Sequence, residues 1–224
     1  MNFDFALILE PFLLSLKTIS VSAILFIIIG IPTAYLLAKK DLKFKWLLNT
    51  IVTLPLIFPP IAVGFFLLLI LGRNGFIGSF FYKFDISLIF SFSGIVIAAF
   101  IAGLPLMVKP IQASIELFPK DIKEASYISG KSQIKTFFYI VMPNIKNSLI
   151  VALLISTARA LGEVGITLML GGNIIGKTDT ISLAIYNAVF DGNYNLAMIL
   201  SGILVIISLL FFVALNFFEK RKNV

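Results

Sequence analysis

The sequence predicts an all-α polytopic membrane protein with five transmembrane helices, its N-terminus outside and its C-terminus in the cytoplasm. Three observations support this prediction. Of the 224 residues, 59% are hydrophobic and only 13% are charged, which is far from the balance of a soluble globular domain. Five apolar segments reach the length of about 20 residues that a membrane-crossing helix needs. Most basic residues fall in segments that five spans would place on one side of the membrane.

The first two predicted spans cover about residues 12–38 and 46–71. The lead-in, residues 1–12, is too short and too acidic for a cleavable signal peptide. The second span contains three prolines, at positions 55, 59 and 60. Proline releases backbone carbonyls that lipid cannot satisfy, so it is tolerated where neighbouring helices or water satisfy them. This span is therefore predicted to be either a broken helix beside a polar pathway or a simple kink in the bundle.

The third predicted span, residues 88–108, precedes the one long polar segment, residues 109–146. Within that segment Pro119 and Asp121 stand where a helix begins, and Gly130 can adopt the left-handed conformation that ends a helix. A second helix is expected to begin near Ser132. The segment therefore predicts two short helices joined by a sharp corner, outside the bilayer.

The fourth predicted span, residues 148–170, carries Arg159 and Glu163, which are four residues apart and so share a helix face. A charge at mid-membrane costs about 2.5–3.5 kcal/mol on insertion scales, so such residues pair and face the bundle or a wet cavity. The pair is either a gate or a structural link that closes the bundle. Flanking Gly162 and Gly165 would allow close helix approach. The candidates for a translocation path or gate are Pro55, Pro59, Pro60, Ser156, Thr157, Arg159 and Glu163.

The fifth predicted span covers residues 196–218, and the distribution of basic residues sets the orientation of all five. Thirteen of the 18 lysines and arginines lie in residues 39–45, 109–146 and 220–222. The opposite loops, residues 72–87 and 171–195, hold three: Arg73, Lys83 and Lys177. By the positive-inside rule the polar segment is cytoplasmic, and the net charge of +7 reflects topology and not nucleic-acid binding.

The composition also excludes most kinds of catalytic site. With no cysteine and no histidine, the chain lacks thiolate nucleophiles, imidazole bases and the usual zinc ligands. It contains no GxxxxGK[ST] phosphate loop. An intramembrane lipid-processing enzyme would need a tight carboxylate cluster, and the spacing of Glu116, Asp121 and Glu124 does not provide one. No catalytic residue, metal site or cofactor is expected in this chain.

The polar segment has a recognisable spacing: Glu124, Ala125 and Ser126 are followed by Gly130 after three residues and by Ile140 after nine more. This spacing resembles the EAA loop of ABC-transporter permeases, in which a coupling helix sits in a groove of a cytoplasmic ATPase. The pattern prefers alanine where this chain has Ser126. The alternative is a solvated amphipathic loop. The coupling residues that the resemblance implies are Glu124, Ala125, Ser126, Gly130, Lys131 and Ser132.

Other stretches resemble the molybdate branch of the oxyanion importer permeases, of which tungstate and sulfate permeases are close relatives. These stretches are LPLIFPP (54–60), GRNGFIG (72–78), LPLMVK (104–109), ARALGEVG (158–165) and GGNIIGKTDTISLAIY (171–186). The resemblance implies a type I ABC importer permease fold, with residues 1–224 forming a single transmembrane domain in the cytoplasmic membrane. A passive channel is disfavoured, because it would leave the coupling element without a role.

The resemblance also implies the partners. They are a second copy of the chain in a homodimer, two cytoplasmic ATPase subunits that hold ATP and Mg²⁺, membrane lipid, and an extracytoplasmic oxyanion-binding protein. The binding protein would dock on the outer loops, although each candidate there is equally compatible with an ordinary solvated loop residue. These docking candidates are Arg73, Asn74, Asn173 and Lys177.

Overall fold

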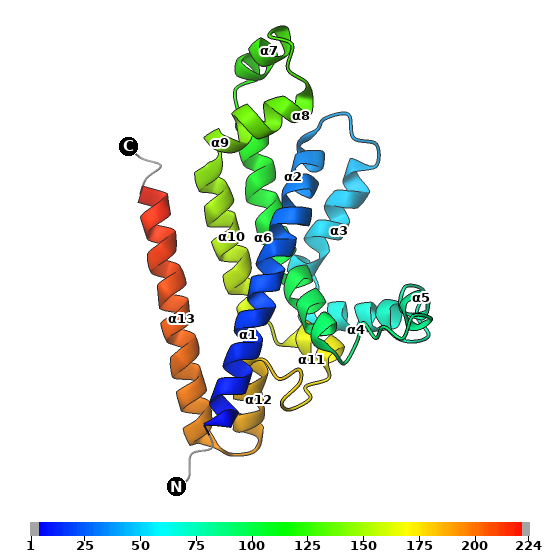
Figure 1. Ribbon diagram of the computed structural model, residues 1–224, viewed down its shortest axis with the longest axis vertical. Coiled ribbons are helices and arrows are strands. Elements are labelled where there is room, and N and C mark those ends of the chain that lie inside the picture. Colours follow the sequence, from blue (N-terminus) through cyan, green and yellow to red (C-terminus); the bar gives the residue numbers. More distant parts are fainter. Residues whose placement is uncertain (1–4, 221–224) are drawn as a thin grey trace.

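The computed structural model describes residues 5–220, with side chains described for residues 5–218, and that part of the chain is helical without any strand (Figure 1). The predicted all-α class is confirmed. The first four residues of the expected lead-in, and the basic tail with Arg221 and Lys222, lie outside the described residues. Residues 6–12 of the lead-in belong to the first helix, which begins at Ala6.

The first span is one rod made of α1 (Ala6–Leu25), a single π-helical turn (Phe26–Gly30) and α2 (Ile31–Ala38). It packs against α6 (Phe92–Leu117), which also packs against α10 (Lys146–Leu161) at the centre of the bundle (Figure 1). Gly103 allows this packing, because a Cβ there would lie 2.4 Å from the Phe26 ring and 2.7 Å from the Ser156 carbonyl oxygen.

Helix α6 differs from the predicted third span at both ends. It begins at Phe92 because the Ser91 hydroxyl accepts a hydrogen bond from the Gly94 amide, as an N-cap does. It continues to Leu117, well into the segment expected to be a polar loop. The apolar face persists there, since Ile111 and Ile115 are four residues apart and both are buried. Polar residues on the opposite face of the helix are the reason why the sequence predicted a loop here.

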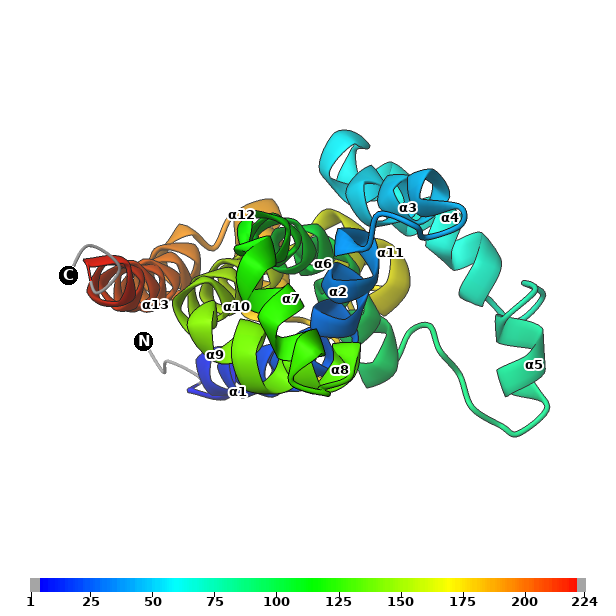
Figure 2. The same cartoon turned by 90° about the horizontal axis from the view of Figure 1, so that it is seen from above.

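The second predicted span is broken, which is one of the two alternatives that its prolines left open. Helix α3 (Lys45–Ile57) ends before Phe58, and α4 (Pro60–Leu71) begins two residues later. Phe58 and Pro59 are both extended, because each precedes a proline and proline disfavours helical geometry in the residue before it. Helix α4 leads into a short helix, α5 (Gly78–Tyr82), on an arm that extends away from the bundle (Figure 2).

The fourth predicted span is also broken, which the sequence did not predict. Helix α10 ends at Leu161, and a separate short helix, α11 (Gly165–Gly171), follows after a gap of three residues. The outer segment after α11 is partly helical as well, because α12 (Ile181–Phe190) lies within it. Ile181, Ala184 and Ala188 recur at helical spacing and are buried in that segment.

Three helices within residues 5–220 are long and apolar enough to cross a membrane unaided: Ala6–Ala38, Phe92–Leu117 and Tyr194–Phe218. The last belongs to α13 (Tyr194–Lys220). A fourth span results if Gln133–Asn144 and Lys146–Leu161, bent by 78°, count as one. The broken α3–α4 segment would have to cross as a unit to make five. The count of five and the orientation therefore stay predictions.

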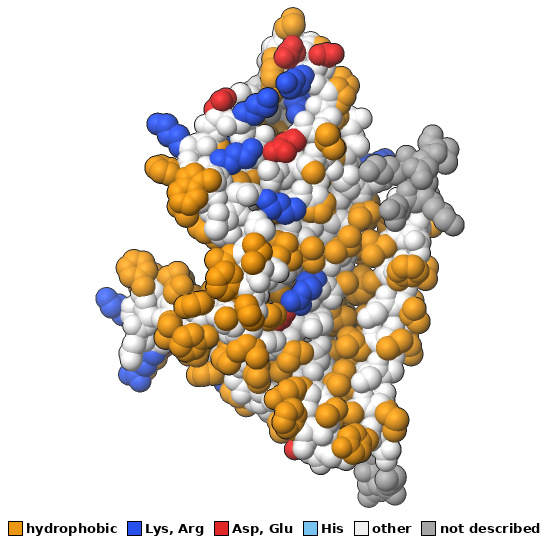
Figure 3. All heavy atoms as spheres, turned by 180° about the vertical axis from the view of Figure 1, so that it is seen from behind, with side chains coloured by type: hydrophobic (Ala, Val, Ile, Leu, Met, Phe, Trp, Pro, Cys, Tyr) orange, Lys and Arg blue, Asp and Glu red, His pale blue; other side chains and the backbone are white. Residues whose placement is uncertain are grey.

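The two ends of the bundle differ in character. Helix α7 (Lys120–Ile128) projects at the end where α13 finishes, whereas α1 begins at the opposite end, beside α12 (Figure 1). Charged side chains gather around the α7 end, and the middle of the face shown in Figure 3 is largely hydrophobic. An apolar belt below a charged end is the surface expected of a protein that crosses a bilayer.

Candidate functional site

The polar corner at Gly130 has the backbone geometry predicted for it. Gly130 has φ of +78°, in the left-handed region that favours glycine. Its amide donates to the Tyr127 carbonyl at 2.9 Å, and the Lys131 amide donates to the Ser126 carbonyl at 3.2 Å. This pair of bonds is the Schellman motif, which ends a helix at a defined angle. The direction in which the chain leaves α7 is therefore fixed by the backbone of the corner.

A buried hydrogen bond between hydroxyl groups holds α7 to the helix that follows it, α8 (Gln133–Thr136). Ser126 and Thr136 are 5% and 1% exposed, and their hydroxyl oxygens are 2.9 Å apart. This contact accounts for serine at the position where the EAA pattern prefers alanine. Thr136 was not among the predicted residues, and the only sequence signal for it was a second hydroxyl ten residues after the first.

Replacing Ser126 with alanine is expected to loosen α7, because Thr136 then loses its buried partner. The expected cost is about 1–2 kcal/mol, and the Ser126→Ala/Thr136→Val double variant should recover most of it because both polar groups are removed. Hydrogen exchange of the α7 amides is the measurement. Equal protection in the single and double variants would show that the hydroxyl pair does not hold the helices together.

The remaining coupling candidates are accessible. Glu124, Ala125, Lys131 and Ser132 are all exposed. The Ser132 hydroxyl also accepts a bond from the Lys135 amide at 3.3 Å and so caps α8. Apolar side chains accompany them, with Ile122 47% and Ile128 88% exposed. The corner thus presents a mixed apolar and polar surface, carried on a rigid helix end.

The two broken spans contact each other at their breaks. A Cβ at Gly165, the first residue of α11, would lie 2.8 Å from the Pro60 Cβ and 3.0 Å from the Ile61 amide nitrogen. A Cβ at Gly64, one turn further along α4, would lie 3.0 Å from the Ile166 Cα. The close approach predicted for the glycines beside Glu163 is confirmed at Gly165. At Gly162 a Cβ would meet only the carbonyl of its own helix, at 3.9 Å.

The Arg159–Glu163 ion pair is confirmed, but the prediction that both residues share a helix face was wrong. An Arg159 guanidinium nitrogen lies 2.6 Å from Glu163 Oε2, while Glu163 itself sits beyond the end of α10, in the break. Glu163 Oε1 accepts the Ile166 amide at 2.8 Å. The Glu163 side chain is 1% exposed and that of Arg159 34%. One buried carboxylate therefore joins the end of α10 to the start of α11.

Two other path candidates use their hydroxyls within their own helix. Ser156 donates to the Ala152 carbonyl and Thr157 to the Leu153 carbonyl, each at 2.7 Å. Ser156 is fully buried, and its carbonyl faces Gly103 of α6. Pro59 and Pro60, in contrast, are exposed in the single chain.

The four docking candidates lie on two separate elements. Arg73 and Asn74 are exposed at the base of the arm, where the Arg73 guanidinium lies 4.3 Å from the Tyr82 ring centre. Asn173 and Lys177 belong to the loop between α11 and α12. Lys177 is exposed there, but Asn173 is half-buried and its side-chain amide bonds reciprocally with that of Asn187.

Buried side chains organise the loop between α11 and α12, and the sequence did not single them out. Thr178 is fully buried, and its hydroxyl accepts the Ile174 amide and donates to the Gly171 carbonyl, each at 2.8 Å. Asp179 is 6% exposed, and burial raises the pKa of its carboxyl. The loop is thus held by bonds to its own buried side chains, and the Lys177 amide donates to the Ile174 carbonyl at 3.0 Å.

Comparison with known proteins gives the family. A family model described as "Binding-protein-dependent transport system inner membrane component" matches residues 26–224. The molybdenum transport system permease protein ModB of Azotobacter vinelandii is 34% identical over 93% of this chain and 93% of its own length. ModB of Escherichia coli is 37% identical over 80% of this chain and 79% of its own.

The match to a sulfate permease covers a smaller share of that relative's length. The sulfate transport system permease protein CysW of Synechococcus elongatus is 32% identical over 78% of this chain, but the match spans only 62% of CysW. These relatives are transport permeases, so this chain is a non-catalytic transport subunit and a multi-pass protein of the cytoplasmic membrane. The resemblance found in the sequence is confirmed: the chain belongs to the family of binding-protein-dependent transport system inner membrane components.

Proposed function

We propose that the chain is the transmembrane subunit of an ATP-driven importer of a tetrahedral oxyanion, most specifically molybdate. Two copies would form the translocation path between them, and two cytoplasmic ATPase subunits would supply the energy. ATP and Mg²⁺ would bind to those subunits and not to this chain. An extracytoplasmic binding protein would deliver the anion to the outer loops.

The observation that carries the proposal is the rigid, projecting corner of α7 and α8. A partner that grips α7 can transmit force only if the helix is fixed to the bundle. Here the Schellman motif at Gly130 and the Ser126–Thr136 bond fix α7 to α8, and the Lys123 ammonium donates to the Ile115 carbonyl of α6 in the bundle. Glu124, Ile128 and Lys131 are exposed, so they would be accessible to the ATPase.

The breaks in the second and fourth spans contact each other. This contact suggests where a movement of α7 would change the translocation path. Force on α7 would reach α10 through α8, a π-helical turn (Phe137–Val141) and α9 (Met142–Asn144). Helices α10 and α11 are separated by the break and linked through Glu163, and α11 packs on α4. A tilt of α10 could therefore be taken up at the break, without disturbing the α4–α11 packing.

The choice of anion rests on the relatives. ModB proteins match over most of their length, whereas the sulfate permease match covers less of its relative. Molybdate, tungstate and sulfate are all tetrahedral dianions, so shape and charge alone do not separate them. A path with weak sites would pass each of them, which leaves the binding protein to do most of the selecting.

Uptake of labelled molybdate tests the proposal. Cells that carry this chain with its partner subunits are expected to accumulate the label, and cells lacking only this chain are not. Excess unlabelled tungstate should compete, and excess sulfate should not. If sulfate competes equally, the substrate is an oxyanion in general or sulfate itself. Uptake that does not depend on the chain would reject the molybdate assignment and leave the family unaffected.

A further inference from the structure

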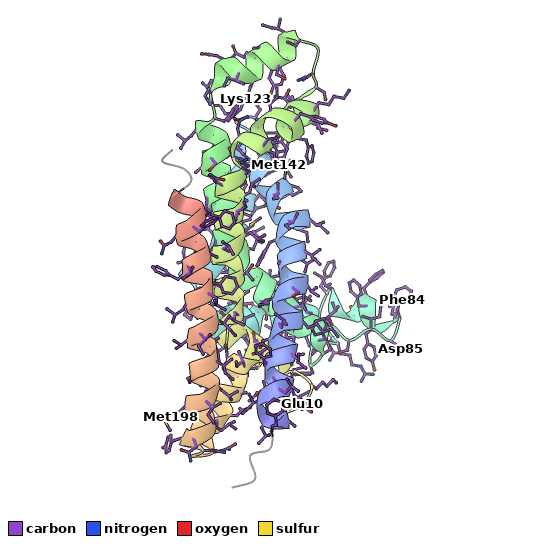
Figure 4. The ribbon with its side chains drawn as sticks, turned by 60° about the vertical axis from the view of Figure 1, so that its left-hand side comes forward. Glu10, Phe84, Asp85, Lys123, Met142 and Met198 are labelled. Atoms are coloured by element: carbon purple, nitrogen blue, oxygen red, sulfur yellow. The ribbon has the colours of Figure 1, made fainter. Side chains whose placement is uncertain are left out.

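A groove of about 720 Å³ lies between the end of the first span and the coupling element. One wall is the end of α2 with the loop that follows it, residues 39–43. The other wall is formed by α7, α8 and the adjoining π-helical turn, and Ile115 of α6 also lines the groove. The groove is thus on the bundle side of α7, the side on which Lys123 lies (Figure 4).

Four lysines line this groove: Lys39, Lys40, Lys43 and Lys123. Asp41 and Glu124 are the acidic residues in the lining, so the lysines are in excess by two. The two ion pairs found among the described side chains involve other residues, and none of the four ammonium groups lies within 4 Å of a carboxylate there. The groove therefore holds positive charge that the described part of the chain does not neutralise.

Two of the ammonium groups are held in place by neighbouring groups. Lys123 donates to the Ile115 carbonyl at 2.8 Å and lies near the Phe118 ring, while Lys39 lies 4.8 Å from the centre of the Tyr35 ring. Burial, with repulsion from Lys120, lowers the pKa of Lys123. An anion in the groove would offset both effects, because an opposite charge stabilises the protonated form.

Part of the lining is apolar. Leu36 and Ala38 of α2 and Phe137 and Val141 of the π-helical turn all contribute to it. Ala38 is also the last residue of the membrane-crossing rod Ala6–Ala38. The groove therefore combines a basic rim with an apolar wall at the point where a helix leaves the bilayer. A free oxyanion would use only the rim, whereas a phospholipid would use both.

We propose that this groove binds the phosphate of an anionic phospholipid, with the lysines around the phosphate and the glycerol end of the acyl chains against the apolar wall. Basic pockets at the cytoplasmic ends of transmembrane helices suit this chemistry. The bound lipid would sit between the first span and the coupling element, and so would connect the ATPase-facing corner to the surrounding membrane.

The test uses the purified full-length chain, together with its ATPase where that copurifies, so it does not depend on the transported anion. Dioctanoyl phosphatidylglycerol or dioctanoyl phosphatidylcholine is titrated in, and native mass spectrometry counts the bound lipid. Phosphatidylglycerol is expected to bind more tightly than phosphatidylcholine. A lysine near an anionic headgroup contributes a factor of about five, so Lys40→Gln/Lys43→Gln should weaken phosphatidylglycerol binding about 25-fold.

The matched control is Lys135→Gln/Lys146→Gln, which removes two exposed lysines of the neighbouring helices α8 and α10 that do not line the groove. Its affinity should equal that of the unaltered chain. Equal weakening in both double variants, or equal binding of the two lipids, overturns the proposal. Displacement of phosphatidylglycerol by millimolar phosphate or molybdate would assign the groove to a free oxyanion. If Lys40→Gln/Lys43→Gln does not yield intact protein, Lys40→Gln alone should weaken binding about fivefold.

Discussion

Replacing Gly130 with valine is expected to abolish the transport-linked stimulation of the partner ATPase while leaving membrane insertion intact. Gly130 has φ of +78° and a Cβ there would meet no atom within 4 Å, so the change acts through the backbone alone. A β-branched residue disfavours the left-handed region strongly, at a cost of about 1–3 kcal/mol. The corner would relax and α8 would leave α7 at a different angle. We expect at least a tenfold loss of stimulated ATPase activity in reconstituted complexes.

Gly192 provides a matched control at the opposite end of the bundle. It has φ of +71°, lies between α12 and α13, and likewise has nothing within 4 Å of a Cβ. Gly192→Val therefore introduces the same kind of backbone strain away from the coupling corner, and ATPase stimulation should survive. Gly130→Asn should be mild, because asparagine tolerates left-handed geometry. Normal stimulation with Gly130→Val would rule out a coupling role for the corner.

The coupling corner could be predicted from sequence because its determinants are local. Pro119, Gly130 and Ser132 each impose a backbone preference on their own position, and the structure has a helix end or start beside each of them. The break at Phe58 is similar, since consecutive prolines specify it without reference to the rest of the fold. Signals of this kind depend on only a few neighbouring residues.

The break in the fourth span could not be predicted in this way. Its sequence reads as a continuous apolar segment with one possible ion pair, and Gly162 and Gly165 lower helix propensity there without requiring the helix to stop at Leu161. The structure shows the reasons to be tertiary: Gly165 packs against Pro60, and Glu163 accepts the Ile166 amide while it pairs with Arg159. Contacts between distant segments also account for the groove beside α7, which no single stretch of sequence indicates.

Replacing Arg159 with methionine is expected to be the most damaging single change in the membrane region. It would leave the Glu163 carboxylate, whose side chain is 1% exposed, without its cation. Breaking a buried pair by removing one partner costs about 3–5 kcal/mol. The apparent melting temperature of the purified complex should fall accordingly. Lys45→Met is the matched control, because the Lys45–Glu116 pair is 33% and 43% exposed and exposed pairs contribute at most about 1 kcal/mol.

The double variant Arg159→Met/Glu163→Gln separates a structural link from a gate. Glutamine keeps an acceptor for the Ile166 amide and carries no charge, so the connection between α10 and α11 survives and the melting temperature should largely recover. If oxyanion uptake recovers with it, the pair acts by holding the break together. If stability recovers but uptake stays as low as in Arg159→Met, the partly exposed guanidinium itself serves the path. A double variant as unstable as the single one would refute the stranded-charge explanation, because no buried carboxylate would remain to cause it.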